Sequence, residues 1–315
     1  TLSYFDEPVI PELERLLLEN WPFTPGTLTI VDGAMDAISR SLDLLLRFGD
    51  RVVVENPGFP PVLDLLEHYG VERIGVQLDS EGMIPESLAM ALHRSPAAVL
   101  LQPRTQNPSG VSMSLDRARE LARVIRNAPG AQSTLVIEDD HSGEISSSED
   151  VSLGAFLPDR VIHIRSFSKS HGPDLRIAAI GGPAGFMDRL VARRILGPGW
   201  TSRMLQTILY DLLTDTTTVG QVANARETYR ERQVAMSAAL AAHGFEQPVA
   251  DGINLWLPVA EERDAVVQLA AAGIRVAAGG VFQSSPIGDF VRVTVGQVRA
   301  DFDAVGQMLA AVAAR

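Results

Sequence analysis

The sequence predicts an α/β protein in which a mainly parallel sheet lies between helices and a smaller α+β domain follows toward the C-terminus. Short β-branched runs alternate with longer helical patterns through much of the 315 residues, and this alternation is typical of the crossover units of a parallel sheet. Runs such as Val52-Val53-Val54 are apolar at every position, which indicates strands buried on both faces. After Gly197-Pro198-Gly199 long helical patterns replace the alternation, so we expect a second domain there.

Each element is expected from its own pattern. β-branched, apolar runs predict strands at 51–55, 71–78, 97–102, 134–139, 161–165 and 176–181. Helical patterns between them predict helices at 35–47, 60–69, 85–93, 115–126 and 186–196. Farther along, we expect helices at 201–213, 218–243, 261–272 and 299–314, and strands at 253–259, 274–278 and 290–295. We therefore place a large domain at residues 1–215 and a small domain at residues 216–315.

Charge and composition exclude several classes of protein. The net charge of −12, without a cluster of Lys and Arg, argues against nucleic-acid binding by this chain itself. No apolar stretch approaches the ~18–20 residues that cross a bilayer, and no signal peptide opens the sequence, so we expect a soluble, cytoplasmic protein. The absence of cysteine excludes thiol catalysis and thiolate metal sites. Because residue 1 is Thr1 and not Met, we expect a fragment without its natural N-terminus.

A single lysine, Lys169, stands among the 27 basic residues, and the other 26 are arginines. A general preference for arginine explains why lysine is scarce. It does not explain why one lysine remains in the motif Ser166-Phe167-Ser168-Lys169. Arginine replaces lysine on a solvated surface but cannot supply an amine that loses its proton. Lys169 is therefore predicted to act as a nucleophilic amine.

Two motifs follow early strands. Asp32-Gly33-Ala34-Met35 comes after the apolar run 28–31 and opens a helix. Free backbone N–H groups at a helix N-terminus bind anions, although Asp32 could also be an ordinary N-cap. In Pro57-Gly58-Phe59-Pro60 the Pro-Gly pair predicts a turn, and Pro60 fits the first turn of the next helix. Phe59 would then stack on a heteroaromatic ring at the strand edge, or be an ordinary core residue.

Three later motifs carry polar side chains. Asn107, in Gln106-Asn107-Pro108-Ser109-Gly110, can bind a phenolic oxygen or form an Asx-Pro turn. The acids of Glu138-Asp139-Asp140-His141 could be metal ligands, but no partner set supports a dedicated site, so we predict no metal. A carboxylate placed there would keep a pyridine nitrogen protonated. Ser166, Ser168 and Arg176 form a phosphate cradle beside the Lys169 amine.

Taken in order and spacing, these motifs resemble those of class I/II aminotransferases, which are pyridoxal 5′-phosphate (PLP) enzymes of fold type I. The resemblance runs from Tyr4 to Arg292, and it implies a mainly parallel, seven-stranded type of sheet. The Glu-Asp-Asp run and the seven-residue spacing from Lys169 to Arg176 are most similar to the aminotransferase-like domains of MocR-type transcriptional regulators.

The resemblance implies a role for each motif residue. Lys169 would form the Schiff base with PLP, and Asp139, rather than Asp140, would pair with the pyridine nitrogen. Phe59 would stack on the ring, and Asn107 would bind its phenolate oxygen and the substrate. The phosphate would be held by Gly33, Ala34, Met35, Ser166, Ser168 and Arg176.

Three further positions complete the implied site. Tyr4 resembles the tyrosine that reaches the phosphate of a neighbouring subunit, which implies a homodimer with shared sites. Arg292, in Phe290-Val291-Arg292-Val293, resembles the arginine that binds the substrate carboxylate. His141 departs from the family, because a tyrosine usually stands in this region to contact the phenolic oxygen. Titration of His141 would then alter the cofactor.

The implied function is PLP-dependent transfer of an amino group between an amino acid and a 2-oxo acid. Other PLP reactions, such as β-elimination, racemisation or decarboxylation, stay open. A second alternative is the PLP- or amine-sensing effector domain of a MocR-type regulator with little turnover, which implies a DNA-binding domain upstream. A nucleotide-binding α/β protein is disfavoured, because the sequence has neither a Gly-x-Gly-x-x-Gly motif nor a P-loop where one is needed.

Overall fold

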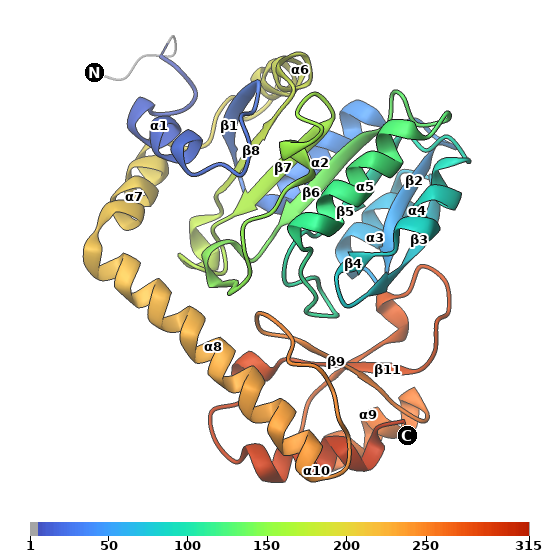
Figure 1. The fold of residues 1–315 in the computed structure, drawn as a ribbon. Helices are drawn as coiled ribbons and strands as arrows, with labels where there is room; N and C mark the ends of the chain where they lie inside the picture. The colour runs from blue at the N-terminus through green and yellow to red at the C-terminus, as the bar shows by residue number, and fades with distance from the viewer. Residues whose placement is uncertain (1–5, 315) are drawn as a thin grey trace.

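The computed structural model describes residues 6–314 and confirms the α/β class. A large sheet lies above a small sheet, and a long diagonal helix runs beside both (Figure 1). Across the large sheet the order is β1 (Thr27–Val31), β8 (Ala178–Gly182), β7 (Val161–Ser166), β6 (Leu135–Asp140), β5 (Ala98–Leu101), β2 (Arg51–Asn56), β3 (Glu72–Asp79) and β4 (Gly82–Met83).

The large sheet is mainly parallel, as predicted. The five neighbours from β7 to β3 run parallel, whereas β8 is antiparallel to both β1 and β7. An eighth strand goes beyond the expected seven. It is the two-residue β4, which pairs with the end of β3 through Leu78↔Met83 and Asp79↔Gly82. Two residues are too few to leave a period-2 pattern in the sequence.

Helices cover both faces of the large sheet (Figure 1). Val52 and Val54 of β2 pack in one hydrophobic cluster and Val53 packs in the other. The unbroken apolar run therefore reflects burial on both faces. One cluster includes α2 (Ala34–Leu45), α3 (Pro60–His68) and α6 (Ala184–Ile195), and the other includes α4 (Pro85–Leu92) and α5 (Leu115–Asn127).

Of the two helices at the β1 edge, only one was predicted from the sequence. The helix α1 (Pro11–Glu19) was not predicted, whereas α7 (Arg203–Thr214) was. Of α1, only Leu13 and Leu17 are buried, and they pack with Leu209 of α7 against β1 and β8. The signal for α1 was nevertheless present, because Leu13, Leu16 and Leu17 stand at helical spacing and Pro11 occupies the first turn.

A separate hydrophobic cluster lies in the C-terminal part. It combines the end of α8 (Thr216–Ala242) with a three-stranded sheet in the order β10 (Ala277–Ala278), β11 (Phe290–Val293), β9 (Leu255–Pro258), and with α9 (Glu262–Ala271) and α10 (Phe302–Val312). Asp215 caps α8, since its side chain accepts a hydrogen bond from the Thr218 N–H. The helix α8 contacts both α7 and α10, so the boundary between residues 215 and 216 remains a prediction.

Several predicted bounds are wrong by a few residues. The strand expected at 176–181 begins only at Ala178, because Arg176 ends the 3₁₀ turn η3 (Pro173–Leu175) with a left-handed φ of 51°. Other 3₁₀ turns are η1 (Gly143–Ile145), η2 (Leu153–Ala155), η4 (Gly280–Phe282) and η5 (Val295–Gln297). Between residues 6 and 314, no helix combines the length and apolar character needed to cross a membrane.

Candidate active site

Apart from Arg292 in β11, the predicted site residues within the described chain lie at or near the ends of strands of the large sheet, at the edge that faces the C-terminal part. Contacts between the two parts mark this edge. The Gly58 N–H donates to the Phe282 carbonyl at 2.8 Å, and the Asp251 N–H donates to the Gly110 carbonyl at 2.9 Å. The carboxyl ends of parallel strands are where open α/β sheets bind ligands. The arrangement therefore gathers the motif residues at a natural binding position.

Gly33 and Arg176 lie against each other at the N-terminus of α2. Gly33 is the N-cap residue with a φ of 103°, and a Cβ atom built on it would lie 2.8 Å from Nη2 of Arg176. The Arg176 guanidinium makes no hydrogen bond or ion pair with any residue from 6 to 314. A free cation and the positive end of a helix thus meet at one point, with Ala34 and Met35 in the first turn.

Asp32 is not the cap of α2, because no side chain caps this helix. The Asp32 carboxylate instead accepts from the Thr201 hydroxyl at 2.7 Å, and it pairs with the buried Arg194 at 3.3 Å. The carboxylate of Asp36 accepts the Asp32 N–H and pairs with Arg40. Both acids near the helix start are therefore neutralised, which favours an anion there.

Asp139 and Asp140 point to different environments at the end of β6. Gln102 Nε2 donates to Asp139 Oδ2 at 2.8 Å, and Asp139 Oδ1 is buried without a hydrogen-bond partner among the described residues. Burial raises the pKa of Asp139, partly offset by the nearby His141 and by the Gln102 hydrogen bond. Asp140 is also buried, but Arg104 binds both of its oxygens, at 2.9 and 2.7 Å, and holds its pKa below the usual range against the effect of burial.

Asn107 and Arg292 meet across the gap between the two parts. Arg292 Nη1 donates to Asn107 Oδ1 at 3.2 Å, and Asn254 Nδ2 lies 3.5 Å from the same oxygen. The guanidinium lies 5.0 Å from the centre of the Phe282 ring, and its Nε atom is buried without a partner. Burial lowers the pKa of Arg292, and no acid pairs with it in the part of the chain from 6 to 314. This half-buried cation is set up to receive a carboxylate.

Lys169 lies in the turn after β7. Its side chain is exposed and makes no hydrogen bond or ion pair within residues 6–314, so no such bond connects it to the other predicted residues. Ser166 is buried, and its hydroxyl accepts the Ser168 N–H at 3.3 Å. An exposed amine is accessible to an aldehyde.

His141 and Phe59 border the site from two sides. His141 Nε2 lies 3.0 Å from the Thr105 carbonyl oxygen, so this ring nitrogen carries the proton and donates. Phe59 is half-buried against the hydrophobic cluster beneath α2 and α3. Part of the Phe59 side chain packs against this cluster, so the interpretation of Phe59 as a core residue is confirmed for the buried part. Tyr4 lies outside the described residues.

The comparisons with known proteins agree with this geometry. The family model described as aminotransferase class I and II matches residues 1–305. The chain belongs to this family. Kynurenine aminotransferase from Pyrococcus horikoshii has a TM-score of 0.85 over 98% of this chain and 80% of its own, at 22% sequence identity. The fold is therefore that of the fold-type I PLP-dependent aminotransferases, as the resemblance implied.

The aminotransferase family includes regulators as well as enzymes. The vitamin B6 salvage pathway transcriptional repressor PtsJ from Salmonella typhimurium is 36% identical over 93% of this chain and 68% of its own length. The transcriptional regulator TauR from Rhodobacter capsulatus is 28% identical over 82% of this chain and 54% of its own. The resemblance to MocR-type regulators is thus confirmed, and the chain spans about half to two thirds of these relatives.

Two residues of the candidate site, Gln102 and Glu55, were not predicted from the sequence. Gln102 follows β5 directly and contacts Asp139, and its backbone N–H donates to Glu55 Oε2 at 3.1 Å. Burial raises the pKa of Glu55 to about 8. A polar residue directly after a buried strand was the available signal for Gln102, and an acid inside a buried strand was the signal for Glu55.

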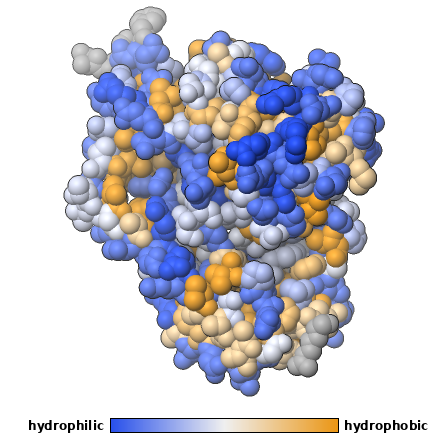
Figure 2. Space-filling model, in the orientation of Figure 1, coloured by the Kyte–Doolittle hydropathy of each residue, from blue (hydrophilic) through white to orange (hydrophobic). Residues whose placement is uncertain are grey.

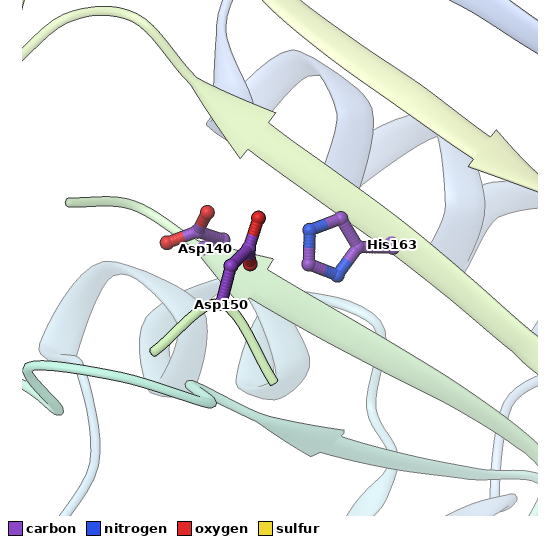
Figure 3. Close-up of side chains that lie close together, drawn as sticks. All are labelled: Asp140, Asp150 and His163. Atoms are coloured by element: carbon purple, nitrogen blue, oxygen red, sulfur yellow. The ribbon is translucent and has the colours of Figure 1, made fainter. Parts of the chain in front are cut away.

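Figure 3 shows Asp140, Asp150 and His163 close together, a grouping with the residue types of a metal site. Arg104 and Arg165 already pair with these carboxylates, and His163 Nδ1 lies 2.8 Å from Glu138 Oε2. Two guanidinium groups at the same oxygens would repel a divalent cation. We therefore interpret the group as a partly buried ion-pair network that fixes the end of β6.

We expect Gly33→Ala to weaken phosphate binding and to destabilise the fold by about 1–3 kcal/mol. The added Cβ would push the Arg176 guanidinium away from α2, and a φ of 103° is strained for any residue with a Cβ. Urea unfolding and PLP titration measure the two effects. In the control Gly220→Ala, a helical position with open space around it, stability should rise by about 0.5–1 kcal/mol and PLP binding should not change.

Proposed function

We propose that this chain is a PLP-dependent aminotransferase domain that transfers an amino group between an amino acid and a 2-oxo acid through Lys169. The proposal depends on one observation above all, the buried Asp139 oxygen that has no partner within residues 6–314. Burying a carboxylate with an unpaired oxygen is costly unless a positive group binds there. A protonated pyridine nitrogen is such a group, and the family implies one.

The other residues fit the remaining parts of the cofactor. The free Arg176 guanidinium and the N–H groups at the start of α2 fit a phosphate. Asn107, next to Arg292, fits the phenolic oxygen, and the half-buried Phe59 can cover a ring face. In this assignment Asp139 is the pyridine partner and Asp140 is not, because Arg104 occupies both Asp140 oxygens.

The residues of the chain would act on the substrate as follows. When bound, PLP supplies an aldehyde and a ring that takes up the electrons of the broken Cα–H bond. Arg292 would bind the substrate α-carboxylate and fix the orientation of the Cα–H bond. The Lys169 amine would hold the cofactor between turnovers and, once displaced by the substrate amine, would take the Cα proton. His141 would stay near the phenolic oxygen through its bond to the Thr105 carbonyl.

We also propose a homodimer. Large hydrophobic side chains are exposed at the end of α6 and on α7: Ile195, Leu196, Met204 and Ile208. Hydrophobic side chains also reach the surface on the face that Figure 2 shows. Exposed apolar patches of this kind mark protein interfaces. A second copy related by a two-fold axis would cover them, and Tyr4 would then be free to reach the neighbouring phosphate.

A second candidate function is the effector domain of a transcriptional regulator. It is supported by the 36% identity to a vitamin B6 pathway repressor. Curated matches also include aminotransferases. In an effector domain, the same residues would bind PLP or an amine adduct, and the reaction would stop before product release.

One experiment separates the two functions. The protein is loaded with PLP, mixed with a panel of amino acids, and the 2-oxo acid formed is measured with and without a second 2-oxo acid as acceptor. An aminotransferase gives one equivalent of product without acceptor and many equivalents with it. A spectral change without product supports the effector domain, and the absence of any PLP binding contradicts both.

The same assay tests Arg292. We expect Arg292→Met to raise KM about 10–100-fold for amino acids, the range for losing a charge-assisted bidentate contact. Amines without a carboxylate should be affected little. Arg275→Met, at an exposed position without ion pairs between residues 6 and 314, is the matched control.

A further inference from the structure

Gln102 contacts three groups of the site at once. Its Nε2 donates to Asp139 Oδ2 at 2.8 Å, its Oε1 accepts the Asn107 N–H at 2.8 Å, and its own N–H donates to Glu55 Oε2 at 3.1 Å. Only 5% of the residue is exposed. Hydrogen bonds at such burial are stronger than in water, so each one constrains the geometry.

The amide of Gln102 has only one orientation that satisfies both partners. The carboxylate of Asp139 accepts hydrogen bonds when ionised, whereas the backbone N–H of Asn107 only donates. A flipped amide would place oxygen against oxygen on one side and N–H against N–H on the other. The contact therefore leaves Asp139 Oδ1 as the free oxygen and sets the position of the Asn107 backbone.

Glu55 supports the same loop by accepting two hydrogen bonds from it. Its Oε2 accepts from the Gln102 N–H and from Gln106 Nε2, the latter at 3.2 Å, and Gln106 also donates to the Pro57 carbonyl at 2.9 Å. The loop from Gln102 to Asn107 is thus bound at both ends. Gln102 connects this support to Asp139 on the neighbouring strand.

We infer that Gln102 is a positioning residue for the proposed cofactor site. It holds Asp139, the proposed pyridine partner, and Asn107, the proposed phenolate partner, at a fixed spacing. The inference rests on the proposed function. It assigns to one side chain the spacing between Asp139 and Asn107, the proposed partners of two different positions on the ring. The charged and titratable groups that act on Asp139 are Asp140, His141, His163 and Glu55, and all of them remain when only Gln102 is changed.

The test uses Gln102→Met, which keeps the length of the side chain and removes both hydrogen bonds. Infrared difference spectra of the cofactor-free protein identify the Asp139 carboxyl band by its loss in Asp139→Asn. The Asp139 titration midpoint should move to higher pH, because a donor to the ionised form is lost. We expect PLP affinity to fall about tenfold, and kcat to fall while KM for the amino acid stays within about twofold.

A second variant distinguishes a specific effect on Asp139 from a general folding defect. Gln102→Glu keeps an acceptor for Asn107 but places a second carboxyl group against Asp139, so the midpoint should move further upward than in Gln102→Met. The control Gln268→Met, at an exposed position on α9, should change none of these quantities.

The outcomes separate the two proposals. An Asp139 midpoint and a PLP affinity that are unchanged in both Gln102 variants would overturn the role of Gln102 and leave the aminotransferase proposal standing. If the unaltered protein binds no PLP, the inference falls together with the proposed function. A shifted midpoint with weakened PLP binding supports the role, since a merely structural residue would not move the titration of one carboxyl group.

Discussion

Lys169→Ala is expected to abolish covalent binding of PLP and to lower turnover by at least about 100-fold, the lower end of the contribution of a positioned general base. Lys169 is the one lysine in the chain, and arginine cannot replace its amine as a nucleophile or base. Reduction with borohydride followed by mass spectrometry measures the covalent bond, and the 2-oxo acid assay measures turnover.

Lys169→Arg is the matched control for charge. It preserves a cation in the same exposed turn, so both variants should lose the covalent bond if the amine itself is required. Non-covalent PLP binding should persist in both, because Asp139, Arg176 and α2 are unaltered. A borohydride-stable adduct in Lys169→Ala would contradict the whole proposal, since no other lysine is present to form it.

The sequence predicted those elements in which every side chain along one or both faces is buried. The run at Val52–Val54 faces two hydrophobic clusters, so its composition alone indicated a central strand. The strand β4 was missed because only two of its residues pair, whereas α1 was missed although its leucines stand at helical spacing. The small strand β10 was expected at 274–278 and comprises only Ala277–Ala278, which pair with two of the four residues of β11.

Site residues could be predicted only where they belong to a short, continuous sequence motif. Gly33 and Arg176 are separated widely in sequence, and their contact follows from each lying next to the end of a strand. The bond from Gln102 to Asp139 could not be predicted, because it depends on the register of β5 against β6. The rejection of Asp32 as a cap depended on the distant Arg194 and Thr201, which compete for its carboxylate.

Asp139 and Asp140 offer the sharpest contrast in the chain, because neighbouring aspartates have opposite pKa shifts. Burial raises the pKa of Asp139, so its contribution to stability is present below the unfolded value of about 3.9 and is lost as pH rises through the folded value. Arg104 lowers the pKa of Asp140 against the effect of burial. That contribution is present above about 3.9 and is lost as pH falls through the folded value.

At neutral pH, Asp139→Asn should therefore leave the cofactor-free protein at least as stable as the unaltered chain, because it removes a buried carboxylate with an unpaired oxygen. Asp140→Asn should destabilise the protein by about 3–5 kcal/mol, since it leaves the buried Arg104 without its main partner. Urea unfolding at pH 7 measures both changes. The difference between the two variants should shrink as the pH is lowered toward 4, because Asp139, which Asp140→Asn retains, contributes to stability again there, whereas the contribution of Asp140 is lost only below about 3.9.

Function should respond in the opposite order. Asp139→Asn should lower turnover on the order of 100-fold or more, because an amide does not keep a pyridine nitrogen protonated and the electrostatic support of the carbanion is lost. Asp140→Asn, measured at a temperature where it is folded, should keep most of the activity, because its oxygens face Arg104. Loss of activity in folded Asp140→Asn with full activity in Asp139→Asn would reverse the assignment of the two carboxylates. The stabilities and the activities of the two variants together thus distinguish Asp140, which stabilises the fold, from Asp139, which is positioned to bind a positive charge.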